Sequence, residues 1–282
     1  MKKKKLIEVI SDRCKTAYPI LMAHGLGFRD DKRFCYWGRI TKKFVENGGQ
    51  VFYGKTEAYA TIETNGAILA ERVNEILAET GAEKVNIIAH SKGGVDARYA
   101  ISTLGIAGKV ASLSTISTPH NGSKSLDFYC RFPRWLRKFI AFFPNIWYRI
   151  IGDKKPHFNA VAEQITTSAC KQFNLNNPDI AGVYYQSFAT VMRHFYSDFW
   201  MIIPYLTIKI FEGQSDGLVT PKAAEWTNFR GILSGPNSRG ISHGDSVDFR
   251  RRRFTKKTAK GKYSDITDFY IELVEGLKNQ GL

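Results

Sequence analysis

The stretch of sequence that decides the fold is KVNIIAHSKGGVDARYA, residues 84–100. Residues 85–89 form a short apolar run, which is typical of a buried strand. Residues 95–104 have the apolar spacing of a helix, and Gly93 and Gly94 stand between the two patterns. Ser91 is therefore expected in a sharp turn from a strand into a helix, with its hydroxyl at the tip of the turn.

The sequence around this turn alternates between strand and helix patterns. Strands are predicted by short apolar runs at residues 18–23, 51–53, 85–89 and 110–116. Helices are predicted by the periodicity of residues 32–47, 62–80 and 95–104. The same signals predict later helices at 160–174 and 265–277 and later strands at 182–188 and 206–211. This alternation predicts an α/β fold with a mostly parallel central sheet and helices on both faces.

The length and composition indicate a globular protein with one large domain. The chain has 282 residues, which is short for two full domains. No apolar run reaches the roughly 18 residues that a membrane-spanning helix needs. The sequence begins MKKKK, but charged residues interrupt the apolar segment that a signal peptide would require, so no secretion signal is expected. Four cysteines without C-x-x-C spacing are expected to be reduced thiols.

The charge balance indicates an anionic partner. Lys and Arg number 41 against 26 Asp and Glu, which gives a net charge of +15. A phospholipid surface, a nucleic acid or an acidic polymer would each suit this charge. A basic run lies near the C-terminal end of the chain and comprises residues 250–253 with Lys256, Lys257, Lys260 and Lys262. It is interpreted either as a solvated loop or as a contact for anionic lipid, and no nucleic-acid motif accompanies it.

The turn at Ser91 has the pattern of a nucleophile elbow. The residues two before and two after the serine must be small in such an elbow, and Ala89 and Gly93 are small. Alanine stands where the usual pattern has its first glycine. The predicted strand before Ser91 and helix after it are the surroundings that an elbow requires. We therefore predict that Ser91 is a nucleophile; the alternative is a serine in an ordinary turn.

A serine nucleophile needs a histidine to accept its proton and an acid to orient that histidine. In proteins with this elbow, the acid and then the histidine follow the serine in the chain. Of the six histidines, His243 is late enough, in a loop before the last predicted helix. Asp216 follows the predicted strand at 206–211 and is the predicted acid. Glu212 is a weaker candidate for the acid, and a simple Asp-Gly turn is the alternative role for Asp216.

Two backbone N–H groups are predicted to stabilise the oxyanion that forms when the serine attacks a carbonyl group. The N–H of Lys92 lies at the start of the helix that follows the elbow. The second donor usually belongs to the loop after the first core strand, which here is His24-Gly25-Leu26-Gly27. The N–H of Leu26 is therefore the second predicted donor, and a plain glycine-rich turn is the alternative.

Six separate segments resemble the bacterial triacylglycerol lipases of the α/β-hydrolase superfamily. The resemblance is nearest to the AHSxGG type of Firmicutes lipases, and it extends to the Pseudomonas and Burkholderia lipases. The segments are YPILMAHGLG (18–27), YWGRI (36–40), KVNIIAHSKGGVDARYA (84–100), VASLSTISTPHNGS (110–123), SDGLV (215–219) and SHGD (242–245). The resemblance implies ester hydrolysis through an acyl-enzyme, with Ser91 as nucleophile, Asp216 as orienting acid and His243 as general base. Such lipases are usually exported.

The resemblance also implies a single α/β-hydrolase domain over residues 1–282 with a helical lid or cap inserted at about 121–165. The candidate lid residues share one helical face and are Trp135, Leu136, Phe139, Ile140 and Phe143. An apolar face with interleaved arginines suits a lid that opens at a lipid surface. Packing of these side chains on the core is the alternative interpretation.

The resemblance further implies a structural calcium ion near the histidine loop, although the ester chemistry itself requires no cofactor. Asp245 matches one ligand position in such lipases, and Asp198 is roughly placed for the other. Calcium takes about six to eight oxygen ligands, and the sequence supplies two carboxylates for it. An aspartate that only caps the loop is the alternative role for Asp245.

The expected function is that of a lipase that cleaves acylglycerols at a lipid–water interface. One alternative keeps the chemistry but changes the substrate, as in a carboxylesterase or a phospholipase-like acyl hydrolase acting on soluble or anionic lipid esters. A second alternative is a basic protein that binds membrane surfaces or nucleic acid on an inactive hydrolase fold. The presence of Ser91, Asp216 and His243 argues against the second alternative.

Overall fold

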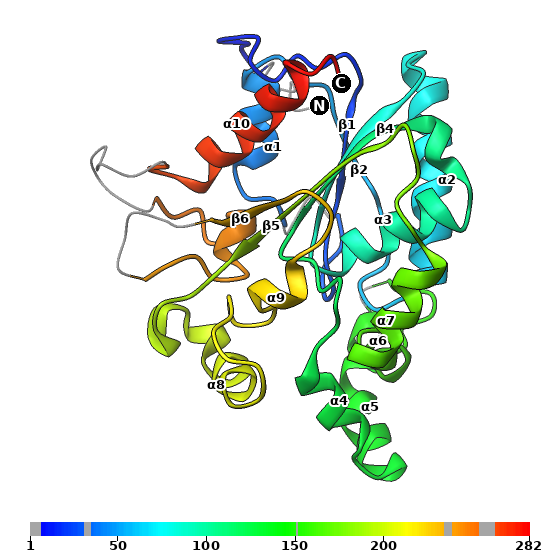
Figure 1. Ribbon diagram of the computed structural model, residues 1–282, viewed down its shortest axis with the longest axis vertical. Helices are drawn as coiled ribbons and strands as arrows, with labels where there is room; N and C mark the ends of the chain where they lie inside the picture. The colour runs from blue at the N-terminus through cyan, green and yellow to red at the C-terminus, as the bar shows by residue number, and fades with distance from the viewer. Residues whose placement is uncertain (1–6, 31–34, 151, 234–238, 254–262) are drawn as a thin grey trace.

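The computed structural model describes residues 7–30, 35–150, 152–233, 239–253 and 263–282 of the chain (Figure 1). Its strands are β1 (Ile20–Ala23), β2 (Val51–Tyr53), β3 (Val85–His90), β4 (Val110–Ile116), β5 (Tyr184–Thr190) and β6 (Phe229–Leu233). Its α-helices are α1 (Ile40–Glu46), α2 (Ile62–Thr80), α3 (Lys92–Ser102), α4 (Lys124–Cys130), α5 (Arg134–Ile150), α6 (Phe158–Gln164), α7 (Thr167–Asn176), α8 (Ile202–Phe211), α9 (Pro221–Ala224) and α10 (Ile266–Lys278). Short 3-10 helices are η1 (Ile106–Lys109), η2 (Phe195–Ser197), η3 (Phe199–Met201) and η4 (Asp245–Val247).

The described strands form one parallel sheet in the order β2-β1-β3-β4-β5-β6. The predicted α/β fold with a parallel sheet is confirmed. Strand β3 lies between β1 and β4, and all residues of these three strands are buried. Strands that are buried on both faces are rich in apolar residues, and β1 and most of β3 show this, whereas β4 also buries Ser112, Ser114 and Thr115.

Helices cover both faces of the sheet (Figure 1). Helices α1 and α10 pack on one face through a cluster that contains Met22 of β1 and Ile88 of β3. Helices α2 and α3 pack on the opposite face, where Leu21 and Ile87 from the same strands belong to a second cluster. Successive strand residues therefore point to opposite layers, as the twofold repeat of a β-strand requires.

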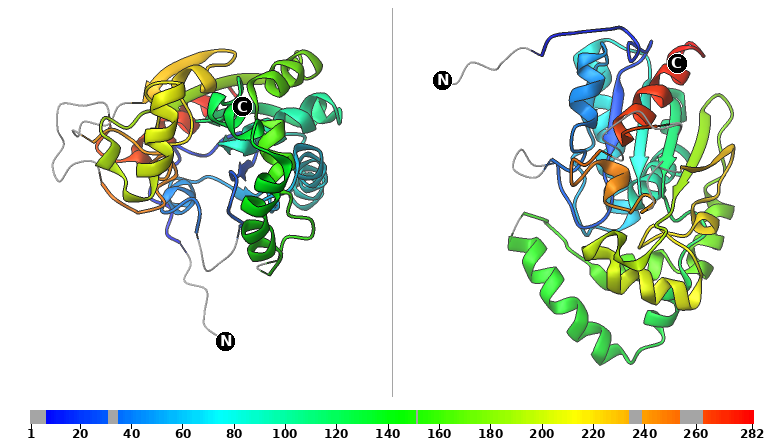
Figure 2. Two further views of the ribbon diagram at one scale, coloured as in Figure 1. Left: turned by 90° about the horizontal axis from the view of Figure 1, so that it is seen from below. Right: turned by 90° about the vertical axis from the view of Figure 1, so that its left-hand side faces the viewer.

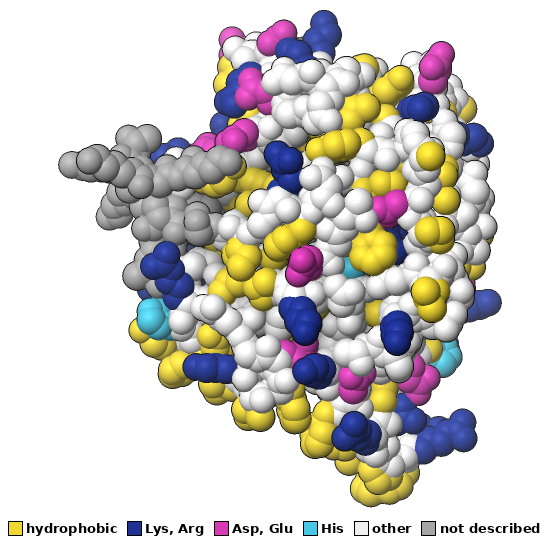
Figure 3. Space-filling view, viewed as in Figure 1, with side chains coloured by type: hydrophobic (Ala, Val, Ile, Leu, Met, Phe, Trp, Pro, Cys, Tyr) yellow, Lys and Arg dark blue, Asp and Glu magenta, His cyan; other side chains and the backbone are white. Residues whose placement is uncertain are grey.

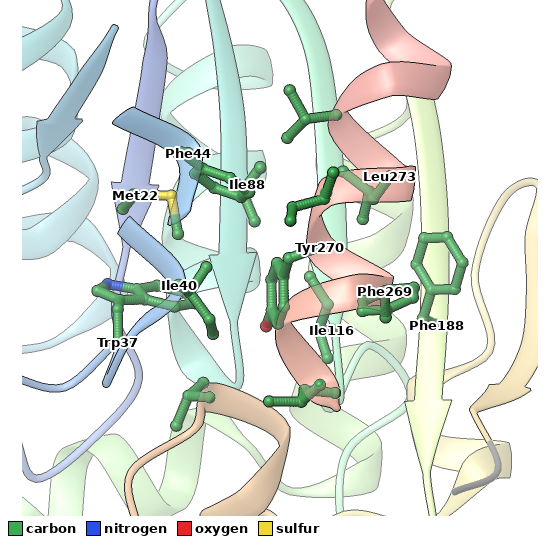
Figure 4. Packing of buried hydrophobic residues seen from close by; sticks show 14 of the residues in the cluster. Met22, Trp37, Ile40, Phe44, Ile88, Ile116, Phe188, Phe269, Tyr270 and Leu273 are labelled. Atoms are coloured by element: carbon green, nitrogen blue, oxygen red, sulfur yellow. The ribbon is translucent and has the colours of Figure 1, made fainter. Parts of the chain in front are cut away.

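Aromatic side chains pack against aliphatic ones in the first of these clusters (Figure 4). Trp37 and Tyr270 are fully buried, and their ring centroids lie 6.3 Å apart in an edge-to-face arrangement. Phe188 of β5 and Phe269 of α10 form a similar pair at 5.0 Å. Because aromatic rings bury large apolar areas, these contacts fix α10 against the carboxyl half of the sheet.

One predicted strand is wrong. Residues 206–211 were expected to be a strand, and the structure places them in helix α8. A short run of Ile, Leu and Phe suits either element, since both bury apolar side chains. Tyr205 and Ile208 lie three residues apart on the buried face of α8, which is the spacing of a helix. Strand β6, which completes the sheet, was not predicted.

Other boundaries differ less. The helix predicted at 32–47 begins at Ile40, and residues 36–39 form turns. The helix predicted at 160–174 is two helices, α6 and α7, and the side chain of Thr166 caps the second by accepting a bond from the N–H of Ala169. The remaining predicted elements agree with the structure to within about two to three residues, the ordinary uncertainty of helix and strand ends.

Several predicted features lie outside the described residues. These are the MKKKK start, residues 32–34 of the predicted helix, and Lys256, Lys257, Lys260 and Lys262 of the basic run. The four cysteines are free thiols, as expected, and Cys14 and Cys170 are buried. Within the described ranges, no helix combines the length and the apolar character that crossing a membrane requires.

Candidate active site

Ser91 lies at the carboxyl end of the sheet, between β3 and α3. Its φ and ψ angles are 54° and −135°, a conformation that is rare for a residue with a side chain. Its N–H donates to the carbonyl oxygen of Ile116 in β4, at 3.0 Å, so the turn is tied to the sheet. The residue is 9% exposed and lines a cavity. Backbone strain at a cavity wall is a feature of functional sites.

Two glycines allow the loop after β1 to pack against this turn. A Cβ atom at Gly93 would lie 2.4 Å from the carbonyl oxygen of His24. A Cβ atom at Gly25 would lie 2.6 Å from the Cβ of Ser91. The loop and the elbow are therefore in direct contact, and Leu26 and Lys92, the predicted oxyanion donors, both line the same cavity as Ser91.

The side chain of Lys92 is buried beside the cavity and paired within α3. Its Nζ lies 2.6 Å from Oδ1 of Asp96, and Asn65 donates to Oδ2 of the same carboxylate at 3.1 Å. Burial raises the pKa of Asp96 above its ordinary value, although Lys92 acts in the opposite direction. The N–H of Lys92 lies in the first turn of α3, where the helix itself offers no acceptor.

Asp216 and His243 form a buried pair. Oδ2 of Asp216 lies 2.8 Å from Nδ1 of His243 and also accepts a bond from Thr190 at the end of β5, at 3.1 Å. The N–H groups of Leu218 and Val219 donate to Oδ1 at 3.0 and 2.8 Å. Burial alone would raise the pKa of Asp216, but His243 and these two donors outweigh it, so the pKa is lowered. The carboxylate is thus held ionised against the imidazole.

His243 reaches the cavity from the loop before η4. The backbone N–H of His243 donates to the carbonyl oxygen of Asp216 at 2.8 Å. Asp216 therefore holds the loop through this bond and the imidazole ring through its carboxylate. His243 and Ser91 both line the cavity, although the hydrogen bonds of the described residues do not include one between their side chains. Catalytic hydrogen bonds are often longer in the absence of substrate.

The alternative acid is held elsewhere. Oε1 of Glu212 accepts bonds from the hydroxyl groups of Ser123 and Ser125 at 2.7 and 3.2 Å. These contacts join the end of α8 to the start of α4. Glu212 therefore has a structural position between two helices, and the histidine loop contacts Asp216 instead.

A buried chain of hydrogen bonds that the sequence did not reveal joins the two loops of the site. The N–H of Gly25 donates to the hydroxyl of Tyr36 at 3.0 Å, and that hydroxyl lies 2.5 Å from Nδ1 of His90. Ser246 donates to the carbonyl oxygen of His243 at 2.7 Å, and its hydroxyl lies 2.8 Å from Nε2 of His90. The bonds are all satisfied when the proton of His90 is on Nε2. The only local signal for it was the position of His90 beside Ser91.

The cavity has a volume of about 640 Å³ and a largely apolar lining. Its apolar walls come mainly from α4, α6, η3 and α8, and include Leu126, Phe158, Val161, Ile165, Trp200, Met201, Pro204 and Ile208. None of the five predicted lid residues is among the lining residues. Trp135, Phe139 and Phe143 of α5 are instead 65–70% exposed. Helix α5 projects from the body of the molecule at the lower end of the right-hand view in Figure 2.

The two predicted metal ligands are brought together, but an arginine lies between them. Nη2 of Arg250 is 2.7 Å from Oδ2 of Asp198 and 2.7 Å from Oδ2 of Asp245. Within the described ranges, no group of three or more His, Cys, Asp and Glu side chains could hold a metal ion. The residues present do not fit a calcium ion, which needs about six to eight oxygens rather than a cationic neighbour.

A serine esterase family model and several triacylglycerol lipases are similar to this chain. The family model described as "Putative serine esterase (DUF676)" matches residues 42–137, about a third of the chain. Triacylglycerol lipase 2 of Saccharomyces cerevisiae is 28% identical over 261 residues, 87% of this chain and 74% of the relative. The triacylglycerol lipase of Burkholderia plantarii is 36% identical over 120 residues, 40% of this chain and 32% of the relative.

Two solved structures are similar to this chain in fold. The mature Bacillus licheniformis lipase BlEst2 has a TM-score of 0.62 at 22% identity and covers 83% of this chain and 87% of its own. The metagenomic carboxyl esterase MGS0156 has a TM-score of 0.67 at 15% identity and covers 99% of this chain and 80% of its own. The protein has the α/β-hydrolase fold. Within that class, it is related at moderate identity to the triacylglycerol lipases, and the resemblance predicted from its motifs is confirmed.

We expect Gly93→Ala to prevent the elbow from forming. Because the added methyl group would meet the backbone oxygens of His24 and Ala23, we expect a loss of about 1–3 kcal/mol in the free energy of unfolding, or no folded protein. Gly108→Ala is the control, since its Cβ would have no atom within 4 Å and its cost should stay within about 0.5 kcal/mol. Urea denaturation measures both, and equal stability of the two variants would contradict the close approach.

The buried histidines predict a loss of stability in acid. Burial lowers the pKa of His90 and of His120 well below the ordinary value. Below about pH 6.5 the unfolded chain binds protons that the folded protein does not, so the free energy of unfolding falls, by up to about 1.4 kcal/mol per pH unit for each histidine.

Replacement of one buried histidine tests this slope. His120→Asn should make the fall between about pH 6.5 and pH 5 shallower by close to one proton, whatever its effect at neutral pH. His157→Gln is the control because His157 is exposed. Urea denaturation at several pH values gives the slope, and an unchanged slope in His120→Asn would refute the explanation.

Proposed function

We propose that this protein is a serine ester hydrolase that acts on lipid esters through an acyl-enzyme. The observation that carries the proposal is the arrangement at one apolar cavity of a strained serine and a buried Asp216–His243 pair. The relatives named as lipases and esterases support the same chemistry.

Each residue has a defined part in the proposed reaction. Oγ of Ser91 attacks the ester carbonyl carbon while its proton passes to Nε2 of His243, whose Nδ1–H is held by Asp216. The N–H groups of Leu26 and Lys92 donate to the oxyanion. The alcohol leaves with the proton from His243. Water then attacks the acyl-enzyme, His243 accepts and returns a proton, and the free acid and Ser91 are released.

The lining of the cavity supports a lipid substrate. Its volume, about 640 Å³, lies within the usual range of ligand pockets, and its walls are mainly aliphatic and aromatic. An acyl chain would bury apolar surface along this lining at about 25 cal/mol per Å². A carboxylesterase acting on short soluble esters is the second candidate, since MGS0156 is named as a carboxyl esterase and shares the fold.

We also propose that residues 121–165 are a cap within a single hydrolase domain. This insertion is anchored beside the predicted oxyanion loop: the hydroxyl of Tyr148 donates to the carbonyl oxygen of Gly27 at 2.8 Å, and Arg29 pairs with Asp153 at 2.9 Å. The apolar side chains of α5 face outward and would contact a lipid surface. Figure 3 shows hydrophobic and basic side chains gathered over α4 and α5 at the lower end of the molecule.

The proposed surface is anionic. The chain carries a net charge of +15, and Arg134, Lys138 and Arg149 are exposed on α5 among its aromatic side chains. Each basic residue at such a surface contributes about 1 kcal/mol. A phospholipid ester is therefore a further candidate substrate, and vesicles of phosphatidylglycerol and of phosphatidylcholine would separate the role of charge from the role of the ester.

Ser91→Ala tests the chemistry. With p-nitrophenyl esters from acetate to palmitate, we expect kcat/KM of the native protein to rise with chain length, because longer chains fill the cavity. The variant should lose at least about a thousandfold at every length. Retention of activity in Ser91→Ala would refute the nucleophile, and activity confined to short esters would favour the carboxylesterase.

Exchange of the exposed aromatic residues tests the surface contact. Phe139→Ser with Phe143→Ser should lower the rate on a long-chain emulsion at least about tenfold. The reason is that burial of each ring in lipid would contribute about 1.5–3 kcal/mol to the free energy of binding. The rate on a soluble butyrate ester should fall much less. Ile10→Ser is the control, because Ile10 is 66% exposed, like Phe143 at 66%, and lies in the N-terminal segment far from α5. Equal losses on both substrates would contradict a lipid contact.

A further inference from the structure

A cluster of four polar side chains lies directly beside His243. The fork of Arg250 contacts Asp245 twice, with Nε to Oδ1 at 3.1 Å and Nη2 to Oδ2 at 2.7 Å. The same Nη2 lies 2.7 Å from Oδ2 of Asp198 and 3.2 Å from the hydroxyl of Ser242. Ser242 in turn donates to Oδ2 of Asp198 at 2.6 Å. Ser242 and Asp245 flank His243 in the chain, so the cluster holds both sides of that loop.

The cluster also holds the wall of the cavity. Oδ1 of Asp198 accepts a bond from the N–H of Trp200 at 3.1 Å, which caps η3 at the entrance to α8. Trp200 and Met201 line the cavity together with Asp198 and Arg250 themselves. A single guanidinium group therefore joins the histidine loop to the segment that leads into α8.

Burial makes the arginine necessary. The side chain of Asp198 is 3% exposed and that of Asp245 is 21% exposed. Two carboxylates that face each other in such surroundings repel, and each would lose solvation without a partner. The guanidinium group is 16% exposed and supplies a positive charge together with directed N–H donors.

We propose that Arg250 is a positioning residue that performs here the role which the resemblance to lipases assigned to a calcium ion. Its guanidinium group bridges Asp198 and Asp245 and keeps the loop of His243 in place against Asp216. The proposal rests on the proposed function of His243 for its catalytic consequence. The native protein is accordingly independent of calcium, both in its stability and in its ester hydrolysis.

The first test uses the native protein and requires no catalytic activity. The protein is treated with EDTA, dialysed, and its Tm is measured with and without millimolar CaCl₂. We expect the same Tm in both conditions. A rise of several degrees with calcium, or a loss of ester hydrolysis on EDTA treatment that calcium restores, would overturn the proposal.

The second test compares Arg250→Ala and Arg250→Lys with Arg252→Ala, which removes an exposed arginine of the same basic run. On p-nitrophenyl butyrate, we expect Arg250→Ala to lose about tenfold or more in kcat with a much smaller change in KM, because the loop that orients His243 is released. Lysine should restore part of the rate, since it supplies the charge without the fork. Arg252→Ala should match the native protein.

Chemical rescue separates positioning from general loss of structure. Millimolar methylguanidinium should raise kcat of Arg250→Ala and leave the native protein and Arg252→Ala unchanged. A kcat of Arg250→Ala equal to that of the native protein would overturn the proposal, and so would a loss confined to KM or a loss that neither methylguanidinium nor lysine repairs. If the native protein hydrolyses no ester, the proposed function fails, whereas the calcium measurement on Tm still decides whether Arg250 replaces the metal.

Discussion

The backbone of Ser91 is the constraint on which the rest of the site depends. A φ angle of 54° is strained for a residue with a side chain, at a cost of about 1–3 kcal/mol. The turn is held by the bond from Ser91 to Ile116 and by the contact of Gly93 with the loop after β1. The serine, the loop of Leu26 and the end of β4 therefore cannot move independently. The central position of β3 in the sheet supplies the burial that offsets the strain.

The central layer could be predicted because its signals are local. Strands β1 and β3 are buried on both faces and appear as short, mainly apolar runs, and α2 ends at Gly81 in a left-handed conformation that glycine adopts easily. Residues 206–211 lack such signals. Their apolar residues suit a strand or a helix, and the packing of Tyr205 and Ile208 decides between them through contacts with distant segments. Strand β6 has the same difficulty, since it depends on its pairing with β5.

In the candidate site too, some residues could be predicted from their order in the chain, whereas others are recognised only from tertiary contacts. Chain order after the elbow selected Asp216 and His243, and the structure brings them within hydrogen-bond distance. Asp216 was also predicted to follow a strand, but residues 206–211 belong to helix α8, and Thr190 at the end of β5 donates to the carboxylate. The bond from His90 to Ser246 spans 156 residues, so no local pattern could have indicated it. Local sequence therefore identifies reactive side chains more readily than the groups that orient them.

The four arginines at residues 250–253 have the same side chain but different surroundings in the fold. Residues 250–253 are four consecutive arginines, and their composition alone suggests one exposed positive surface. In the fold, Arg250 turns inward to two carboxylates, whereas Arg251, Arg252 and Arg253 are exposed. The inward contact is stable because Asp198 and Asp245 are partly removed from water. An ion pair in such a partly buried position is screened less than one at the surface. The exposed arginines face solvent, where salt screens them and a pair contributes little. The net charge of the chain thus overstates the positive charge that an anionic surface would meet. The charge of Arg250 is neutralised by two carboxylates and instead holds the loop of His243.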